Sequence, residues 1–191
     1  MSFDELEDRI FPWIKAVEPD SADGRAGGIT DENGEVAADI VVMDFMADLV
    51  ITFAVDEGEY FSLLRRGDMP ENMTVDALYT LGKKNLSEQV EFNLTGTNYG
   101  GFGILAGGDH EAGALCLDFI WDAVVKQAGE NLVIAVPAKD CLFMALASDP
   151  GQVDAMSELS KDIFENGERI LTRTLFLFDA GTREFSVYGQ F

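Results

Sequence analysis

A chain of 191 residues, 47% of them hydrophobic, is long enough to bury a sizeable core, and this composition excludes a disordered protein. Its 35 acidic and 13 basic residues give a formal net charge of −22. That charge argues against nucleic acid and anionic membranes as partners, because both attract basic clusters. It is typical of a solubility adaptation or, as the sharper interpretation, of a surface that meets a basic protein partner.

The sequence carries no sign of export or membrane insertion. No apolar run approaches the roughly 20 residues that span a bilayer, and the acidic start lacks the pattern of a secretory signal. Two cysteines, Cys116 and Cys141, are too few for a disulfide scaffold. A cytoplasmic location is therefore expected.

The first segment has the pattern of a helix. Ser2 and Glu5 form a capping box, and apolar residues follow at helical spacing. Pro12 predicts a kink or break near Phe11. Residues 18–34 are rich in Asp, Gly and Ser, which predicts a loop.

Two strands and a helix are predicted next. Residues 36–43 and 49–56 are rich in Val, Ile and Phe and predict a hairpin. Residues 60–66 predict a helical turn. Thr74 is the expected cap of a helix that runs to about Glu88.

Strands at 90–95 and 101–105 precede the longest predicted helix, Asp109–Gln127. Asp122 lies on its wet face and can pair with Lys126 one turn on. The opposite face is an apolar stripe that predicts burial against a sheet. This stripe consists of Ala112, Leu115, Cys116, Phe119, Ile120, Ala123 and Val124.

The last part of the chain alternates short strands with one more helix. Residues 132–136 and 142–147 predict strands, and Asp149 followed by proline is a strong helix start. Residues 170–178 and 184–191 predict the clearest hairpin of the chain. Its apolar residues could pair edge to edge, which predicts a homodimer through this hairpin. They are Leu175, Leu177, Phe185, Val187 and Phe191.

Strands joined by hairpins, with helices between the pairs, favour an α+β fold. We expect a mostly antiparallel or mixed sheet covered by helices in a single domain, with the predicted Asp109–Gln127 helix at its centre. The N-terminal helix and the acidic glycine-rich loop occupy residues 1–34. The α+β domain occupies residues 35–191.

Five polar residues form the candidate functional cluster: Asp109, His110, Glu111, Lys139 and Asp140. The single histidine of the chain could act as a general base steered by a carboxylate. A lone histidine in a first turn is more often structural, and the second histidine of a metalloprotease helix is absent. No metal site is expected.

The glycines between Gly100 and Gly108 precede a helix start, as in a phosphate cradle. Their spacing matches neither the Rossmann nor the Walker pattern, and the carboxylates of Asp109 and Glu111 would repel a phosphate. Tight packing is the favoured interpretation, and no cofactor is expected. Chemistry between Cys141 and His110 would require the fold to bring them together, and buried free thiols are favoured.

Four segments carry short recognisable motifs: residues 51–70, 74–90, 107–122 and 133–144. The motifs include Asn85-Leu86, Trp121-Asp122 and Val136-Pro137-Ala138-Lys139-Asp140. In order and spacing these segments resemble the bacterial YtpQ-like family, whose members are proteins of unknown function. The resemblance implies no activity and no catalytic residues, because the family has none established.

The sequence therefore leads to two functional hypotheses. The first is an acidic cytoplasmic protein that acts as a non-catalytic protein-binding or regulatory domain. The alternative is a small hydrolase-like enzyme with its site at the candidate cluster. The enzyme requires the helix start at Asp109 and the strand end at Asp140 to face one pocket.

Overall fold

The computed structural model describes residues 3–17 and 39–191, and its contacts group the chain into two units. The N-terminal unit is Met1–Val90 and the C-terminal unit is Glu91–Phe191. In each unit an antiparallel sheet accompanies helices, which confirms the α+β prediction. The predicted boundary between residues 34 and 35 lies outside the described residues, together with the predicted loop before it.

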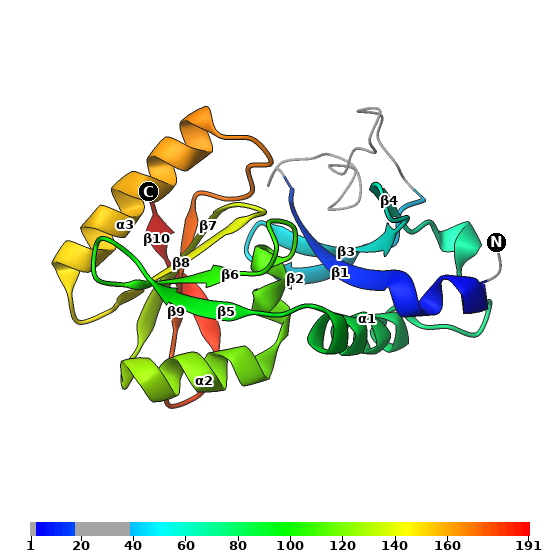
Figure 1. The fold of residues 1–191 in the computed structure, drawn as a ribbon, viewed down its shortest axis with the longest axis horizontal. Helices are drawn as coiled ribbons and strands as arrows, with labels where there is room; N and C mark the ends of the chain where they lie inside the picture. The colour runs from blue at the N-terminus through cyan, green and yellow to red at the C-terminus, as the bar shows by residue number, and fades with distance from the viewer. Residues whose placement is uncertain (1–2, 18–38) are drawn as a thin grey trace. The chain divides into compact units, whose positions relative to one another are not determined.

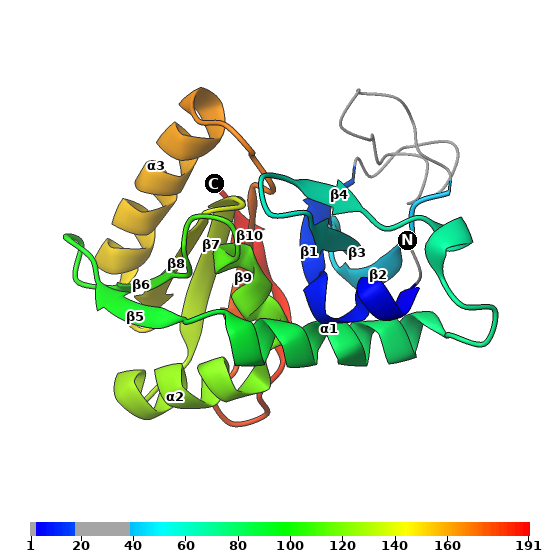
Figure 2. The ribbon, with the colours of Figure 1, turned by 45° about the vertical axis from the view of Figure 1, so that its right-hand side comes forward.

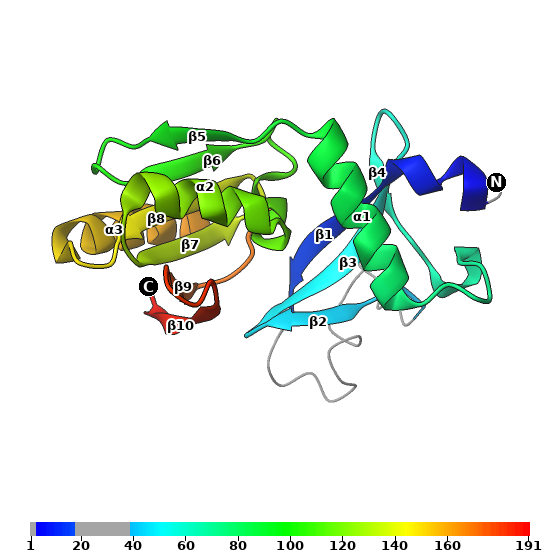
Figure 3. The same ribbon diagram turned by 90° about the horizontal axis from the view of Figure 1, so that it is seen from below.

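The sheet of the N-terminal unit has the strand order β1-β3-β2, and β4 also pairs with β3. Figure 3 shows β3 between β1 and β2. All the pairs are antiparallel. The strands are β1 (Ile10–Ala16), β2 (Met43–Met46), β3 (Leu49–Asp56) and β4 (Phe61–Leu63). Short 3₁₀ turns are η1 (Phe3–Glu5), η2 (Glu7–Arg9) and η4 (Arg66–Asp68).

The predicted N-terminal helix is wrong, because Ile10–Ala16 forms the strand β1. The first five residues of this strand are buried, so both of its faces are covered. A strand buried on both faces is a continuous apolar run, and such a run also matches helical spacing. Pro12 is tolerated because β1 pairs only with β3 among the described strands. The helical turn predicted at residues 60–66 is likewise wrong, since β4 lies there.

Helix α1 (Val75–Gln89) begins where the sequence predicts. The Thr74 hydroxyl accepts a hydrogen bond from the Ala77 N–H at 3.1 Å and caps the helix. Figure 2 shows α1 along one face of the β1-β3-β2 sheet. The two elements approach closely at Gly82, where an added Cβ would lie 3.1 Å from Cδ of Pro12.

The C-terminal unit contains a six-stranded antiparallel sheet in the order β10-β9-β7-β8-β6-β5. Strands β5 and β10 are therefore the two edges, as Figure 3 shows. Each strand overlaps a predicted one, so the predicted C-terminal hairpin is confirmed. The strands are β5 (Asn93–Gly96), β6 (Phe102–Leu105), β7 (Leu132–Ala138), β8 (Cys141–Leu146), β9 (Thr174–Phe178) and β10 (Phe185–Gln190).

Two helices, α2 (Asp118–Ala128) and α3 (Pro150–Asn166), lie on opposite faces of this sheet (Figure 1). On one face, Met156 of α3 packs in a buried cluster with residues of β7, β8 and β9. On the other face, the Trp121 ring of α2 lies 5.2 Å from the Phe178 ring of β9. Both faces of the sheet are therefore used as core.

The predicted helix Asp109–Gln127 is wrong as a single element. A 3₁₀ helix, η5 (Glu111–Cys116), is followed by the extended residue Leu117, and only then does α2 begin. In its first turn the Ala112 N–H donates to the carbonyl of Lys139, in the turn between β7 and β8. The break rotates the helix, so that Phe119 of the predicted buried stripe is exposed.

Candidate functional site

The structure brings the two predicted halves of the candidate cluster together. Asp109, His110 and Glu111 lie between β6 and η5, and Lys139 and Asp140 form the turn between β7 and β8. The N–H of the residue after Glu111 donates to the carbonyl oxygen of Lys139 at 3.1 Å. We call these five residues the Glu111 cluster.

Glu111 is the buried anchor of this cluster, with 2% of its surface exposed. Its Oε1 accepts hydrogen bonds from the N–H groups of Ala106 and Gly108, each at 2.8 Å. Gly107 and Gly108 have φ angles of 80° and 89°, which favour glycine. The glycine turn therefore binds a carboxylate of its own chain, and the donors expected of a phosphate cradle are occupied.

Arg169, which the sequence did not single out, holds the exposed side of the cluster. Its Nη2 lies 2.8 Å from Oδ1 of Asp109, and its Nη1 donates to the Gly108 carbonyl at 3.0 Å. Its own carbonyl accepts from the Lys139 N–H at 3.0 Å. Arg169 lies 60 residues from Asp109 in the chain, so no local spacing could have revealed the pair.

Cys141, beside the cluster, is a poor nucleophile. Burial, together with the negative charges of Asp140 and Glu111, raises the pKa of its thiol to about 12. The Sγ atom lies 3.6 Å from Oδ1 of Asp140. Because the thiolate is the reactive form, this thiol stays protonated and unreactive at neutral pH.

The geometry of the Glu111 cluster is that of a group of residues that stabilises the fold. Its buried carboxylate is bound to backbone donors, and Asp109 is paired with Arg169. Within residues 3–17 and 39–191, no group of three or more His, Cys, Asp or Glu side chains is arranged to hold a metal ion. The two segments therefore lie side by side, and the carboxylates of Asp109 and Glu111 are bound by groups of the fold itself.

Two of the motif residues behind the family resemblance have clear roles in the fold. Asn85 is buried in α1, and its Nδ2 donates to the carbonyl oxygens of Glu7 at 2.7 Å and Ile10 at 2.9 Å. Trp121 donates its indole N–H to the carbonyl of Ala114 at 2.9 Å. These contacts fasten helices to neighbouring backbone.

A second acidic region of the C-terminal unit is open. A cavity of about 360 Å³ lies between α2 and the β9–β10 hairpin. Asp122 pairs there with Arg183, with 3.0 Å between its Oδ1 and the arginine Nε, and not with the predicted Lys126. We call this cavity the Trp121 pocket, and it is lined by Asp118, Trp121, Asp122, Phe178, Arg183 and Phe185.

The aromatic wall of the Trp121 pocket is a packed set of three rings. The Trp121 ring lies 5.2 Å from Phe178 and 5.1 Å from Phe185, and the two phenylalanine rings lie 4.8 Å apart. Trp121 and Phe178 are buried, and Phe185 is half-buried. Such offset and edge-to-face packing fixes the shape of the wall.

The outer edge of the same hairpin is exposed. Among the described strands, β10 pairs only with β9. Val187 is 62% exposed, and Tyr188, the extra residue at the register shift between Val187 and Gly189, is 50% exposed. Two apolar side chains of this edge strand are therefore accessible.

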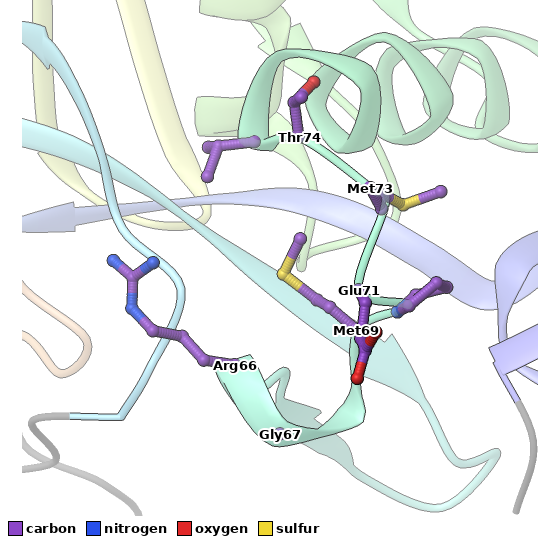
Figure 4. A pocket seen from close by; sticks show the side chains of 8 residues that line it. Arg66, Gly67, Met69, Glu71, Met73 and Thr74 are labelled. Carbon is purple, nitrogen blue, oxygen red and sulfur yellow. The ribbon is translucent and has the colours of Figure 1, made fainter.

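The N-terminal unit has a more open hollow of about 480 Å³ between η4 and the start of α1. Figure 4 shows Met69 and Met73 in its wall, with the Arg66 side chain extending away from Met73. Methionine-lined hollows adapt to apolar side chains. This hollow lacks the convergent charges and rings of the Trp121 pocket.

Comparison of the chain with protein-family models, with curated proteins and with solved structures gives no match. The resemblance to the YtpQ-like family therefore stays a prediction. Among the residues that the structure describes, no helix has the length and apolar character needed to cross a membrane.

Proposed function

We propose that this protein is a non-catalytic protein-binding module of the cytoplasm. Its edge strand β10 would receive an extended segment of a basic partner protein. The observation that carries this proposal is an accessible strand edge with no charged side chain. Residues 185–191 contain no Asp, Glu, Lys or Arg, in a chain in which 25% of the residues are charged.

Natural proteins usually protect an exposed strand edge with charged side chains, prolines or bulges. Strand β10 has a register shift between Val187 and Gly189, but it has neither charge nor proline. Its apolar Val187 and Tyr188 flank a row of backbone groups that can pair with another strand. Adding a partner strand to such an edge is a common mode of peptide recognition.

The net charge selects the class of partner. A chain with a formal charge of −22 attracts a basic segment over long distances and repels another acidic protein. The same repulsion weakens pairing between two copies of the chain, so we place a basic protein at β10 and not a second copy. The formation of the predicted homodimer is an alternative outcome of the test.

Selection of short random peptides displayed on phage, with the full chain as bait, tests this proposal. We expect enrichment of peptides that alternate apolar residues and carry Lys or Arg. The variant Val187→Lys should lose them, because a lysine both repels a basic segment and blocks the edge. Tyr60→Lys is the matched control, since Tyr60 is 60% exposed in the N-terminal unit.

The proposal fails if selected peptides bind Val187→Lys as tightly as the native chain. It also fails if sedimentation shows a stable dimer that Val187→Lys converts to a monomer, because a second copy would then occupy the edge.

A small hydrolase-like enzyme is the second candidate, and the meeting of Asp109–Glu111 with Lys139–Asp140 favours it. Hydrolysis of p-nitrophenyl acetate or p-nitrophenyl phosphate would test it. The activity should be lost in His110→Gln and kept in Val187→Lys. Activity that survives His110→Gln would count against this site.

A further inference from the structure

The Trp121 pocket contains one negative charge that no residue in the described part of the chain compensates. Of its three charged side chains, Asp122 pairs with Arg183 at 3.0 Å. Arg183 is held in place, because its Nη1 donates to the carbonyl of Ala180. Asp118 makes no ion pair or hydrogen bond with the residues that the structure describes. The pocket therefore favours a ligand with one positive charge.

The aromatic wall suits the same kind of ligand. The indole N–H of Trp121 is already used by the Ala114 carbonyl, and Trp121 and Phe178 are buried, so the ring that the pocket offers to a ligand is mainly that of the half-buried Phe185. Ring faces attract cations, and guanidinium groups also stack on them. A volume of about 360 Å³ is enough for one long side chain and lies at the small end of ligand sites.

The pocket also adjoins the proposed docking edge. Phe185 lines the pocket and is the first residue of β10. If a partner segment pairs along β10, the residue at the end of that segment nearest to Phe185 therefore lies next to the pocket.

We infer that the Trp121 pocket binds the side chain of an arginine at the end of the partner's docked segment. The guanidinium lies against the aromatic wall and pairs with the carboxylate of Asp118. Arginine suits this site better than lysine, because its planar fork both stacks and bonds a carboxylate in two places. This inference rests on the proposed function and names a residue that the partner must carry.

A titration followed by nuclear magnetic resonance tests the inference on the full chain. The probe is N-acetyl-arginine-N′-methylamide, which carries the side-chain charge alone, and the isosteric control is the citrulline analogue, which is neutral. The chain has two tryptophans, so Trp121 reports the pocket through its indole signal while Trp13 in the N-terminal unit is the internal control. We expect a dissociation constant on the order of 1 mM, with a shift at Trp121 only.

Two variants with opposite effects sharpen the test. Asp118→Asn should weaken binding of the arginine probe about tenfold, because it removes the free carboxylate. Arg183→Asn should strengthen binding about fivefold, because it frees the second carboxylate. Asparagine is chosen because Arg183 has a φ of 62°, which asparagine tolerates. Asp76→Asn is the matched control, since Asp76 and Asp118 are both exposed acids in the first turn of a helix.

The inference is overturned if the citrulline analogue shifts Trp121 as strongly as the arginine probe, or if a lysine analogue binds equally well. It is also overturned if Arg183→Asn weakens binding. These failures are distinguishable from failure of the proposed function. If peptides still bind β10 and still lose affinity in Val187→Lys, the docking edge stands and only the arginine pocket falls.

Discussion

Two acidic regions of the C-terminal unit look alike in sequence and differ in how their charges are used. In the Glu111 cluster, the buried carboxylate accepts two backbone hydrogen bonds and Asp109 pairs with Arg169. In the Trp121 pocket, Asp118 faces a cavity and has no partner among the described residues.

This difference separates acids that hold the fold from acids that are open to a ligand. A carboxylate bound to buried backbone donors contributes to stability, and its removal leaves those donors unsatisfied. An exposed carboxylate beside an aromatic wall contributes little to stability and can bind a cation. Substitutions in the first region should therefore change stability, and substitutions in the second should change binding.

The largest expected effect is on the reactivity of Cys141. Burial and the nearby carboxylates of Asp140 and Glu111 raise the pKa of its thiol to about 12, so its thiolate fraction at neutral pH should be about a thousandfold below that of a thiol at the ordinary value of 9.0. Iodoacetamide labelling followed by mass spectrometry should show slow modification in the folded chain and fast modification in urea. Asp140→Asn should speed the folded reaction, because one of the charges that raise the pKa is gone. Rapid labelling of the folded native chain would point instead to an activated thiol.

Next in size is the stability lost in Glu111→Ala. Two N–H donors, of Ala106 and Gly108, lose their acceptor, and we expect a decrease in the free energy of unfolding of about 3 kcal/mol. Urea denaturation measures it. The control is Asp140→Ala, an exposed residue of the same cluster, which should change stability by less than about 0.5 kcal/mol. Equal stability of the two variants would show that Glu111 is not an anchor.

A pair of aspartate variants contrasts the two regions directly. Asp109→Asn breaks an exposed ion pair with Arg169 and should cost at most about 1 kcal/mol of stability without changing peptide affinity. Asp118→Asn should leave stability nearly unchanged and weaken the selected arginine peptides about tenfold. Calorimetric titration measures the peptide affinity of both variants, and thermal unfolding measures their stability. The reverse pattern would exchange the roles assigned to the two regions.

The smallest expected effect concerns the turn between β9 and β10. Hydrogen bonds from the Thr182 and Gly181 N–H groups lower the pKa of Asp179. A lowered pKa in the folded state means that the carboxylate stabilises the turn above its unfolded pKa, and that this contribution is lost as the pH falls through the folded pKa. Asp179→Asn should therefore lower Tm slightly at neutral pH and not in strong acid. A constant difference in Tm at all pH values would contradict this account.

Local signals predicted much of the fold. The Thr74 cap, the Asp149-proline start of α3 and the C-terminal hairpin all lie where the sequence places them. These features succeed because the deciding contacts are a few residues apart. The predicted N-terminal helix is wrong because β1 is a strand that is buried on both faces. Such a strand is a continuous apolar run, and the sequence pattern of that run does not distinguish it from a helix.

The candidate site likewise has features that the sequence indicates and features that only the structure reveals. The structure brings Asp109–Glu111 beside Lys139–Asp140, which the enzyme hypothesis required and the sequence could not decide, and the sequence misses both arginines that pair with the acids of the two regions. Arg169 and Arg183 reach Asp109 and Asp122 only through the fold, from about 60 residues further along the chain. Which acids are free is therefore a property of the tertiary structure.

Hydrogen exchange of the full chain, with and without a selected arginine-containing peptide, tests the central claim most directly. The account predicts that the peptide protects the backbone amides of β10 (Phe185–Gln190) and of the first turn of α2, and leaves the Glu111 cluster unchanged. Protection at the opposite edge strand β5, or around Glu111 and Asp140, would contradict it.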